Sequence, residues 1–156
     1  MRGKALRLGP DLNTDVIIPA RFMQDWDHLG EHVFEGEDPA LPKRAAACKF
    51  VVAGKNFGCG SSREQAVMAI KQAGIECVIA PTFARIFYRN AINLALPLLE
   101  ADVDCADDAV LEVDVASGRI VDVASGRSWQ APPLPAEAKA IVDDGGLIEH
   151  LKKKFG

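Results

Sequence analysis

The sequence predicts an α/β fold with a mixed sheet flanked by helices, and two observations lead to this prediction. Residues 49–80 contain an apolar run, a glycine-rich loop, an amphipathic helical pattern and a second apolar run, which is the order of a β-loop-α-β unit. Residues 110–123 alternate apolar and polar side chains around a short ASGR turn, which is typical of an antiparallel hairpin. The first unit pairs strands in parallel and the second pairs them antiparallel. The length of 156 residues is expected to form a single domain, residues 1–156.

The N-terminal part is predicted to hold one strand and one long loop. Residues 4–8 alternate polar and apolar side chains and indicate a strand that runs into the turn formers of residues 9–11. Residues 16–18 are an apolar triplet that a proline ends. Residues 20–44 show no sustained periodicity, so we interpret them as a long surface loop with room for a helical turn. Such loops are usually functional or mobile, and a plain connector is the alternative.

The central part has the most regular pattern. Residues 49–53 indicate a short buried strand. After the glycine-rich loop, apolar residues recur at helical spacing over residues 63–73, and Gly74 is placed to end that helix. Residues 77–80 then return as a strand. This order predicts two parallel strands joined by a right-handed crossover.

The C-terminal part is predicted to be helix, short strand, hairpin and helix. Thr82 is expected to be the N-cap of a helix that runs toward Asn90, and residues 96–99 follow as a short extended piece. After the hairpin, residues 136–142 and 147–154 indicate a helix that two glycines interrupt.

The composition excludes several classes of protein. Eighteen Lys and Arg against twenty-two Asp and Glu give a net charge of −4, and 49% of residues are hydrophobic, which favours a soluble globular protein. The one basic run, residues 152–154, is interpreted as a solvated helix end, so nucleic acid is not an expected partner. The most apolar stretch, residues 91–99, is too short and too interrupted to span a membrane. No signal peptide is readable, which makes the cytoplasm the expected compartment.

The four cysteines do not have the spacing of a metal site or a disulfide framework. Cys48, Cys59, Cys77 and Cys105 lie eleven, eighteen and twenty-eight residues apart, without a C-x-x-C pair. We interpret them as reduced thiols. His28 and His32 are four residues apart but have no third ligand nearby, so no metal site is expected.

The loop before the central helix is the strongest candidate for a site. Residues 58–64 read GCGSSRE, and they lie between a predicted strand and the start of a helix. Glycines let the backbone approach a ligand closely, and the start of a helix offers free N–H groups to an anion. The loop matches neither a Walker A sequence, a dinucleotide fingerprint nor a nucleophile elbow. We therefore expect an anion site of another kind.

Helix capping is the alternative explanation for this loop. Ser61 with Glu64 and Ser62 with Gln65 match two overlapping capping boxes. A helix needs only one N-cap, so one hydroxyl would remain beside Arg63, whose guanidinium can bind a carboxylate bidentately. Nearby N–H donors and Arg63 would also stabilise a serine alkoxide. Cys59 is interpreted as a small residue lining the loop, and a reactive thiol is the alternative.

Four segments, in chain order, are similar to sequence blocks of the aconitase-superfamily swivelling domain. They read NTDVIIPAR at residues 13–21, GKNFGCGSSRE at 54–64, FARIFYRN at 83–90 and IVDDGGL at 141–147. The matches extend over nearly the whole chain. The length most resembles the short form of the 3-isopropylmalate dehydratase small subunits, to which homoaconitase small subunits are closely related.

The resemblance implies a swivelling β/β/α domain that closes over a separate large subunit, in a heterodimer or heterotetramer. In this family the [4Fe–4S] cluster lies on the large subunit, so no cofactor is expected on this chain. The implied activity is that of a hydro-lyase, active only with its large subunit, that interconverts 2-isopropylmalate and 3-isopropylmalate by dehydration and rehydration in leucine biosynthesis. The expected substrate is a small dicarboxylate or tricarboxylate hydroxy acid.

The resemblance also implies roles for single residues. Ser61 matches the serine that acts as the base, and Ser62 and Arg63 match ligands of the substrate carboxylate. Asp15 matches an active-site acid of the N-terminal block, and Arg21 matches a further carboxylate ligand. Asp15 as the cap of a turn and Arg21 as a solvated surface charge are the alternatives.

The chain departs from the family pattern at two places. Gln65 replaces the histidine that usually follows the Ser-Ser-Arg-Glu motif. The second place is the specificity loop, residues 22–36, which in this family contacts the part of the substrate that differs between members. Its start is unlike the Tyr-Leu-Arg-Thr loop of the short form, and its side chains Phe22, Met23 and Trp26 can either line an apolar pocket for an alkyl group or anchor the loop. A homoaconitase small subunit or another 2-substituted-malate dehydratase is therefore an alternative function, and an anion-binding module without a partner is a second.

Overall fold

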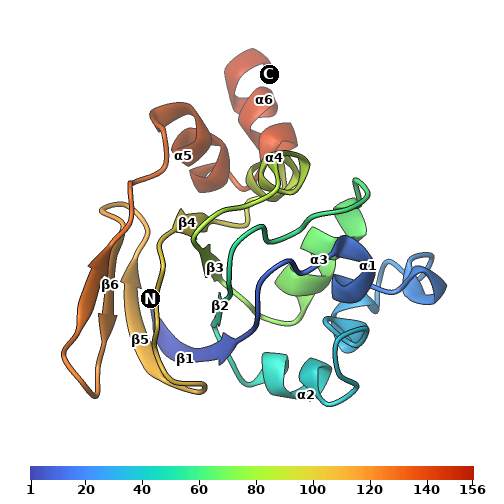
Figure 1. Cartoon of the computed structure of the whole chain (residues 1–156). Coiled ribbons are helices and arrows are strands. Elements are labelled where there is room, and N and C mark those ends of the chain that lie inside the picture. The colour runs from blue at the N-terminus through green and yellow to red at the C-terminus, as the bar shows by residue number, and fades with distance from the viewer.

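A seven-stranded mixed sheet organises the computed structural model, which describes residues 1–156 (Figure 1). The strand order is β4-β3-β2-β1-β5-β6-β7, in which β1 to β4 pair in parallel and β5 to β7 pair antiparallel. The predicted mixed α/β sheet is thus confirmed. The strands are β1 (Arg2–Arg7), β2 (Phe50–Val52), β3 (Cys77–Ala80), β4 (Leu98–Glu100), β5 (Val110–Asp114), β6 (Arg119–Asp122) and β7 (Ser128–Gln130).

The helices lie around the parallel half of the sheet. The predicted β-loop-α-β unit is present as β2, α3 and β3, with β2 and β3 in parallel pairing. The helices are α1 (Thr14–Ile17), α2 (Leu41–Ala46), α3 (Glu64–Gln72), α4 (Arg85–Asn93), α5 (Ala136–Asp143) and α6 (Leu147–Phe155), with two 3₁₀ turns, η1 (Ala20–Phe22) and η2 (Leu29–His32).

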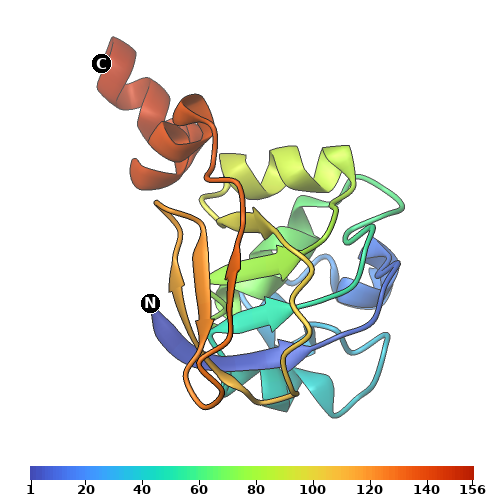
Figure 2. The same cartoon turned by 60° about the vertical axis from the view of Figure 1, so that its left-hand side comes forward.

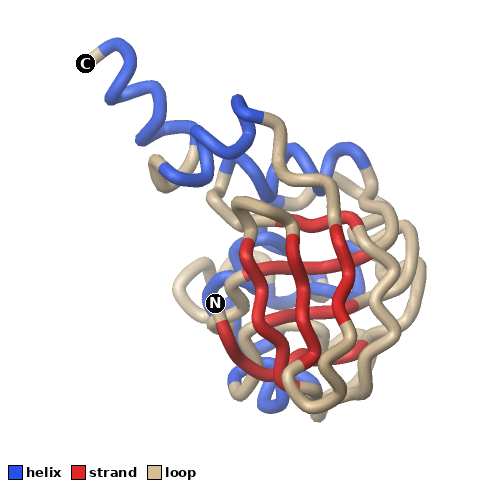
Figure 3. Tube along the Cα trace, turned by 90° about the vertical axis from the view of Figure 1, so that its left-hand side faces the viewer, coloured by secondary structure: helices blue, strands red, loops and turns tan.

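Two apolar clusters occupy the two faces of the parallel strands, because successive strand residues point to opposite faces. Leu6, Val51 and Val78 face the helices and pack against Val67 and Ile70 of α3. The other face packs against the antiparallel strands, which curl across the parallel ones (Figure 3). This second cluster contains Ala5, Phe50, Val52, Cys77, Ile79, Leu99, Leu111, Val113 and Ile120.

The prediction of a surface loop with a helical turn over residues 20–44 is only partly confirmed. This segment forms η1, η2 and α2, and Leu29, Val33 and Phe34 within it are fully buried in the helix-side cluster. Their spacing follows short turns and contacts with α3, so it has no helical or strand period in the sequence. The strand β7 was not predicted because its three residues contain a single apolar side chain, Trp129.

The C-terminal helices pack on α4 at one side of the molecule. Two glycines with positive φ, Gly145 at +92° and Gly146 at +121°, separate α5 from α6, as the sequence predicts. Figure 2 shows α5 and α6 projecting from the side of the molecule opposite the loops that follow β1 and β2. No helix is long and apolar enough to cross a membrane.

Candidate functional site

The loops that follow β1, β2 and β3 are joined at the carboxyl edge of the parallel strands, where ligands bind in many open α/β sheets. The Gly58 N–H donates to Leu12 O at 2.8 Å, and the Thr14 N–H donates to Cys59 O at 2.8 Å. On the other side, the Phe57 N–H donates to Thr82 O at 3.1 Å. The loop of residues 53–63 is therefore bound by backbone hydrogen bonds to both of its neighbours.

Two glycines of this loop are required by its shape. Gly58 has φ +83°, and a Cβ at that position would collide with the Phe87 side chain. Gly60 has φ +99°, and a Cβ there would lie 2.5 Å from Asn13 Oδ1. Both positions combine a left-handed backbone with close packing, which only glycine accommodates without strain. The glycines thus let the segments after β1 and β2 come into contact.

Arg63 binds the segment that follows β1. Its Nη2 lies 2.7 Å from Asp15 Oδ1, and its Nη1 donates to Ile18 O at 3.4 Å. The Arg63 side chain is 17% exposed, whereas the Asp15 carboxylate is 58% exposed. The guanidinium is therefore oriented by a nearly buried stem while its paired acid remains open to solvent.

The predicted capping boxes are wrong. Helix α3 begins at Glu64 after Arg63, which is extended at φ −136° and ψ 107°, and no side chain caps the helix. The backbone turns into the helix one or two residues too late for the hydroxyls of Ser61 and Ser62 to reach the first free N–H groups. Both serines are exposed beside the start of α3, so neither hydroxyl serves as its cap.

Thr82 is likewise not an N-cap. Helix α4 begins at Arg85 after Ala84, and Thr82 Oγ1 instead accepts the Asn56 N–H at 2.8 Å. The threonine holds the loop after β2 rather than the helix after β3, because the chain remains extended through residue 84.

Three polar residues that were not singled out from the sequence support the loop. Asn13 caps α1, since its Oδ1 accepts the Asp15 N–H at 2.8 Å. Thr14 Oγ1 donates to Ser61 O at 2.9 Å, and Asn90 Nδ2 donates to Ser62 Oγ at 3.4 Å. Asn13 and Thr14 are adjacent to Asp15 in the sequence, which is the signal that could have indicated them.

A shallow cavity of about 430 Å³ adjoins the glycine loop. Gly58 and Gly60 form one side of it, and Ala84, Arg85, Ile86 and Arg89 form the other. Arg85 and Arg89 are exposed and one helical turn apart on α4, so both can turn toward this cavity. The surroundings of the loop are therefore rich in cationic side chains, as binding of a carboxylate requires.

The three specificity-loop residues differ in burial. Phe22 and Met23 are partly buried against the helix-side cluster, whereas Trp26 is 45% exposed. None of the three lines the cavities at the glycine loop, between η2 and α2, or beside α4, α5 and the strands. Arg21 is 69% exposed, and its Nη2 lies 3.7 Å from Glu35 Oε2. Of the two alternatives, packing against the core describes Phe22 and Met23.

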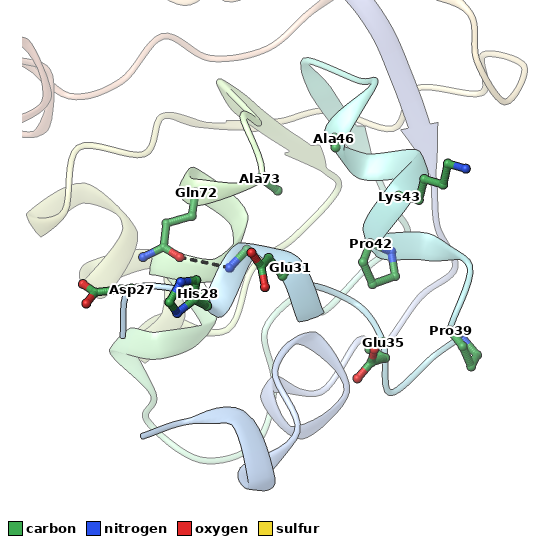
Figure 4. A pocket seen from close by; sticks show the side chains of 11 residues that line it. Asp27, His28, Glu31, Glu35, Pro39, Pro42, Lys43, Ala46, Gln72 and Ala73 are labelled. Carbon is green, nitrogen blue, oxygen red and sulfur yellow. Dashed lines mark hydrogen bonds between the residues drawn. The ribbon is translucent and has the colours of Figure 1, made fainter. Parts of the chain in front are cut away.

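A larger cavity of about 640 Å³ lies between η2 and α2 (Figure 4). Its polar side chains include Asp27, His28, Glu31 and Lys43, which do not converge on a common point. At its edge, Gln72 Oε1 accepts the Gly30 N–H at 3.0 Å. This cavity is separate from the carboxyl edge of the parallel strands.

The structure gathers no group of three or more His, Cys, Asp or Glu residues that could hold a metal ion. Cys48, Cys77 and Cys105 are buried, and burial raises the pKa of the Cys77 thiol to about 12. Cys59 is partly exposed, with its Sγ 3.5 Å from Asp11 O. The residues of this chain therefore do not fit an iron–sulfur cluster.

Comparison with known proteins gives the family. The model of the aconitase C-terminal domain matches residues 18–102. The chain is 47% identical to a 3-isopropylmalate dehydratase small subunit of Methanosarcina mazei, with 98% of this chain and 97% of the relative covered. It is 43% identical to a methanogen homoaconitase small subunit of Methanothermobacter thermautotrophicus, with 98% and 91% covered.

A solved structure agrees with these matches. The crystal structure of a 3-isopropylmalate dehydratase from Methanocaldococcus jannaschii superposes with a TM-score of 0.93 at 41% identity. The superposition covers 98% of this chain and 93% of the other. Sequence, family model and fold agree over almost the full length, and the chain belongs to the aconitase C-terminal domain family.

Proposed function

We propose that the chain is the small subunit of a hydro-lyase that interconverts 2-isopropylmalate and 3-isopropylmalate by dehydration and rehydration. The 3-isopropylmalate dehydratase small subunits at 46–47% identity support this proposal. One observation carries it. Arg63, held by Asp15, and two serines that do not cap α3 lie together at the carboxyl edge of the parallel strands. Dehydration of a dianionic hydroxy acid requires a cation that binds a carboxylate and a base that removes a proton, both at one site.

Arg63 is proposed to bind a substrate carboxylate together with Ser62. A guanidinium has five N–H donors, and the contacts with Asp15 and Ile18 leave donors available for a second carboxylate. Asp15 fixes the orientation of this fork before the substrate arrives, which lowers the entropy lost on binding. Arg21 is proposed to bind a further carboxylate from η1, the turn that follows α1.

Ser61 is proposed to be the base that removes a proton from the carbon next to the leaving hydroxyl. Its hydroxyl is exposed beside the start of α3 and is not used as a helix cap. The Arg63 guanidinium and the free N–H groups of the first turn of α3 favour the negative charge of an alkoxide. The same hydroxyl can return the proton when water adds to the neighbouring carbon.

The remaining chemistry is proposed to belong to a large subunit. The residues of this chain do not form a cluster site, and a [4Fe–4S] cluster is expected on the partner, where it would hold the leaving hydroxyl. The small subunit would complete the site by closing its loop edge over the partner, in a heterodimer or heterotetramer.

A homoaconitase small subunit is the second candidate function. The relative of that name in Methanothermobacter thermautotrophicus is 43% identical and covers 98% of this chain. Arg21 favours this candidate among the residues of the chain, because an exposed guanidinium next to Phe22 suits a substituent that carries a further carboxylate.

Anaerobic co-purification with the large subunit tests both candidates. The complex is assayed with 2-substituted malates whose substituents are methyl, isopropyl and carboxyalkyl groups. We expect the highest kcat/KM with the isopropyl compound and no turnover by either chain alone. Preference for a carboxyalkyl compound would select the second candidate, and hydration by this chain without a partner would contradict the division of labour.

A further inference from the structure

Four side chains in the segment after α1 form a closed ring of contacts. The Phe22 and His32 rings are stacked, with centroids 3.6 Å apart and planes within 2° of parallel. The Arg21 guanidinium carbon lies 4.6 Å from the centroid of the Phe22 ring. Glu35 Oε2 closes the ring, since it lies 3.3 Å from His32 Nδ1 and 3.7 Å from Arg21 Nη2.

The side of the ring formed by His32 and Glu35 is anchored in the protein, and the side formed by Arg21 faces solvent. Val33 and Phe34, between His32 and Glu35 in the chain, are fully buried. The Phe34 N–H donates to Ile17 O at 2.8 Å, and the Gly36 N–H donates to Val16 O at 3.2 Å. This part of the chain is therefore bound to α1, the helix that carries Asp15.

The two side chains of the segment bound to α1 are less exposed than that of Arg21. The side chains of His32 and Glu35 are 28% and 21% exposed, whereas that of Arg21 is 69% exposed. A long exposed arginine normally samples many rotamers, and fixing it costs side-chain entropy. The stacked Phe22 ring and Glu35 restrict Arg21 before a ligand binds. The 3.7 Å separation from Glu35 is long for an ion pair, so a substrate carboxylate can replace Glu35 at the guanidinium.

A second histidine in the same segment provides a built-in comparison. His28 Nδ1 lies 2.8 Å from Asp25 Oδ1, with the same spacing of three residues as His32 and Glu35. Both members of that pair are more than half exposed, and His28 stacks on no aromatic ring. His32, unlike His28, thus combines ring stacking, partial burial and a carboxylate that it shares with an arginine.

We propose that His32 and Glu35 are positioning residues, which hold the Phe22 ring and the Arg21 guanidinium above it in the orientation that receives a carboxylate of the substrate. The proposal rests on the proposed function, because that function gives Arg21 a substrate carboxylate to bind. It adds two residues to the site, one supporting the Phe22 ring by stacking and one orienting the Arg21 guanidinium by its charge.

His32→Ala, in the complex with the large subunit, is the first test. We expect KM for the preferred malate to rise by about tenfold, the size of one lost oriented charged contact, while kcat changes by less than about twofold. His32→Phe retains an aromatic ring for stacking and should recover most of the loss. His28→Ala is the matched control and should change neither constant.

Glu35→Gln separates the two tasks. The amide keeps a hydrogen-bond acceptor for His32 but removes the charge that attracts Arg21. KM should rise for the preferred malate while the stack stays intact. Unchanged KM in both His32→Ala and Glu35→Gln, or an equal change in His28→Ala, would overturn the proposal.

An NMR measurement on this chain without the large subunit tests the positioning role independently of the proposed function. In NMR spectra, the His32 ring protons should show an upfield ring-current shift that Phe22→Leu abolishes. The Arg21 Nε–H should exchange faster in His32→Ala than in the unaltered chain, and equal exchange would overturn the positioning role even in an inactive complex. Lack of turnover in the unaltered complex would contradict the proposed function instead.

Discussion

Arg63 Nη2 lies 2.7 Å from Asp15 Oδ1, and this ion pair joins the loop after β2 to the helix after β1. The two residues follow neighbouring parallel strands, β1 and β2, whose carboxyl ends meet at the same edge of the sheet. Asp15 is 58% exposed, so the pair contributes little to stability by itself. Its consequence is geometric, because it fixes the direction of the nearly buried Arg63 side chain.

Arg63→Lys is expected to weaken substrate binding strongly. A lysine keeps the positive charge, but it cannot offer the planar fork that binds Asp15, Ile18 O and a substrate carboxylate together. KM of the complex should rise by about 10- to 100-fold, the loss expected for charge-assisted hydrogen bonds. Steady-state kinetics with 2-isopropylmalate measures this change. Unchanged kcat and KM would remove Arg63 from the site.

Ser61→Ala is expected to reduce kcat by about 10²- to 10⁴-fold, the contribution of a general base. Association with the large subunit should remain nearly intact, because the Ser61 side chain is exposed and its backbone carbonyl still accepts from Thr14. Co-purification and single-turnover assays measure the two effects separately. Ser125→Ala, in the turn between β6 and β7, is the control and should behave as the unaltered chain. Equal loss of association in Ser61→Ala would indicate a structural role.

The central unit could be predicted because its signals are local. The apolar run of β2, the helical spacing of α3 and the run of β3 each lie within about ten residues, where periodicity decides the structure. The ion pair between Asp15 and Arg63 depends instead on β1 pairing with β2 across more than forty residues. No pattern within either segment contains that information.

The capping boxes and the loop of residues 20–44 show a second limit. The residues before α3 match a cap locally, but Arg63 is drawn into an extended conformation by its contacts with Asp15 and Ile18. The residues around Leu29 and Phe34 have the composition of a loop. Both side chains are nevertheless buried in the cluster that includes α3. Tertiary contacts thus override local signals where the site is built.

Gly60→Ala is expected to destabilise the chain more than Gly74→Ala. Both glycines have nearly the same positive φ, +99° and +96°, so each substitution costs about 1 to 2 kcal/mol for the left-handed backbone. Gly74 has open space around it, whereas a Cβ at Gly60 lies 2.5 Å from Asn13 Oδ1, which caps α1. We expect about 1 kcal/mol or more of additional loss at Gly60. Urea unfolding measures both variants, and equal losses would show that Asn13 can move freely.

Gln72→Ala is expected to release the far end of the specificity loop. Gln72 Nε2 donates to Trp26 O at 2.6 Å, and its Oε1 accepts the Gly30 N–H at 3.0 Å. Removing both bonds should accelerate hydrogen exchange of the Gly30 amide by about tenfold, since a net hydrogen bond contributes about 1 kcal/mol. Gln130→Ala, which removes a comparable backbone bridge at Ser117, is the control. Exchange of the Gly30 amide should be unchanged in Gln130→Ala. Unchanged exchange in Gln72→Ala as well would contradict the prediction.

Cys77 is expected to make stability decrease above pH 9. Full burial against Ile79 and Leu99 raises the pKa of the thiol from 9.0 to about 12 in the folded chain, whereas the unfolded chain keeps the ordinary value. The folded state therefore retains a proton that the unfolded state loses, so this contribution is complete below pH 9 and disappears as the pH approaches 12. Between those limits the free energy of unfolding should fall by about 1.4 kcal/mol per pH unit for this one group. Urea unfolding of the unaltered chain and Cys77→Ala at pH 8 and pH 10.5 isolates the effect, and parallel losses in both chains would show that other groups cause it.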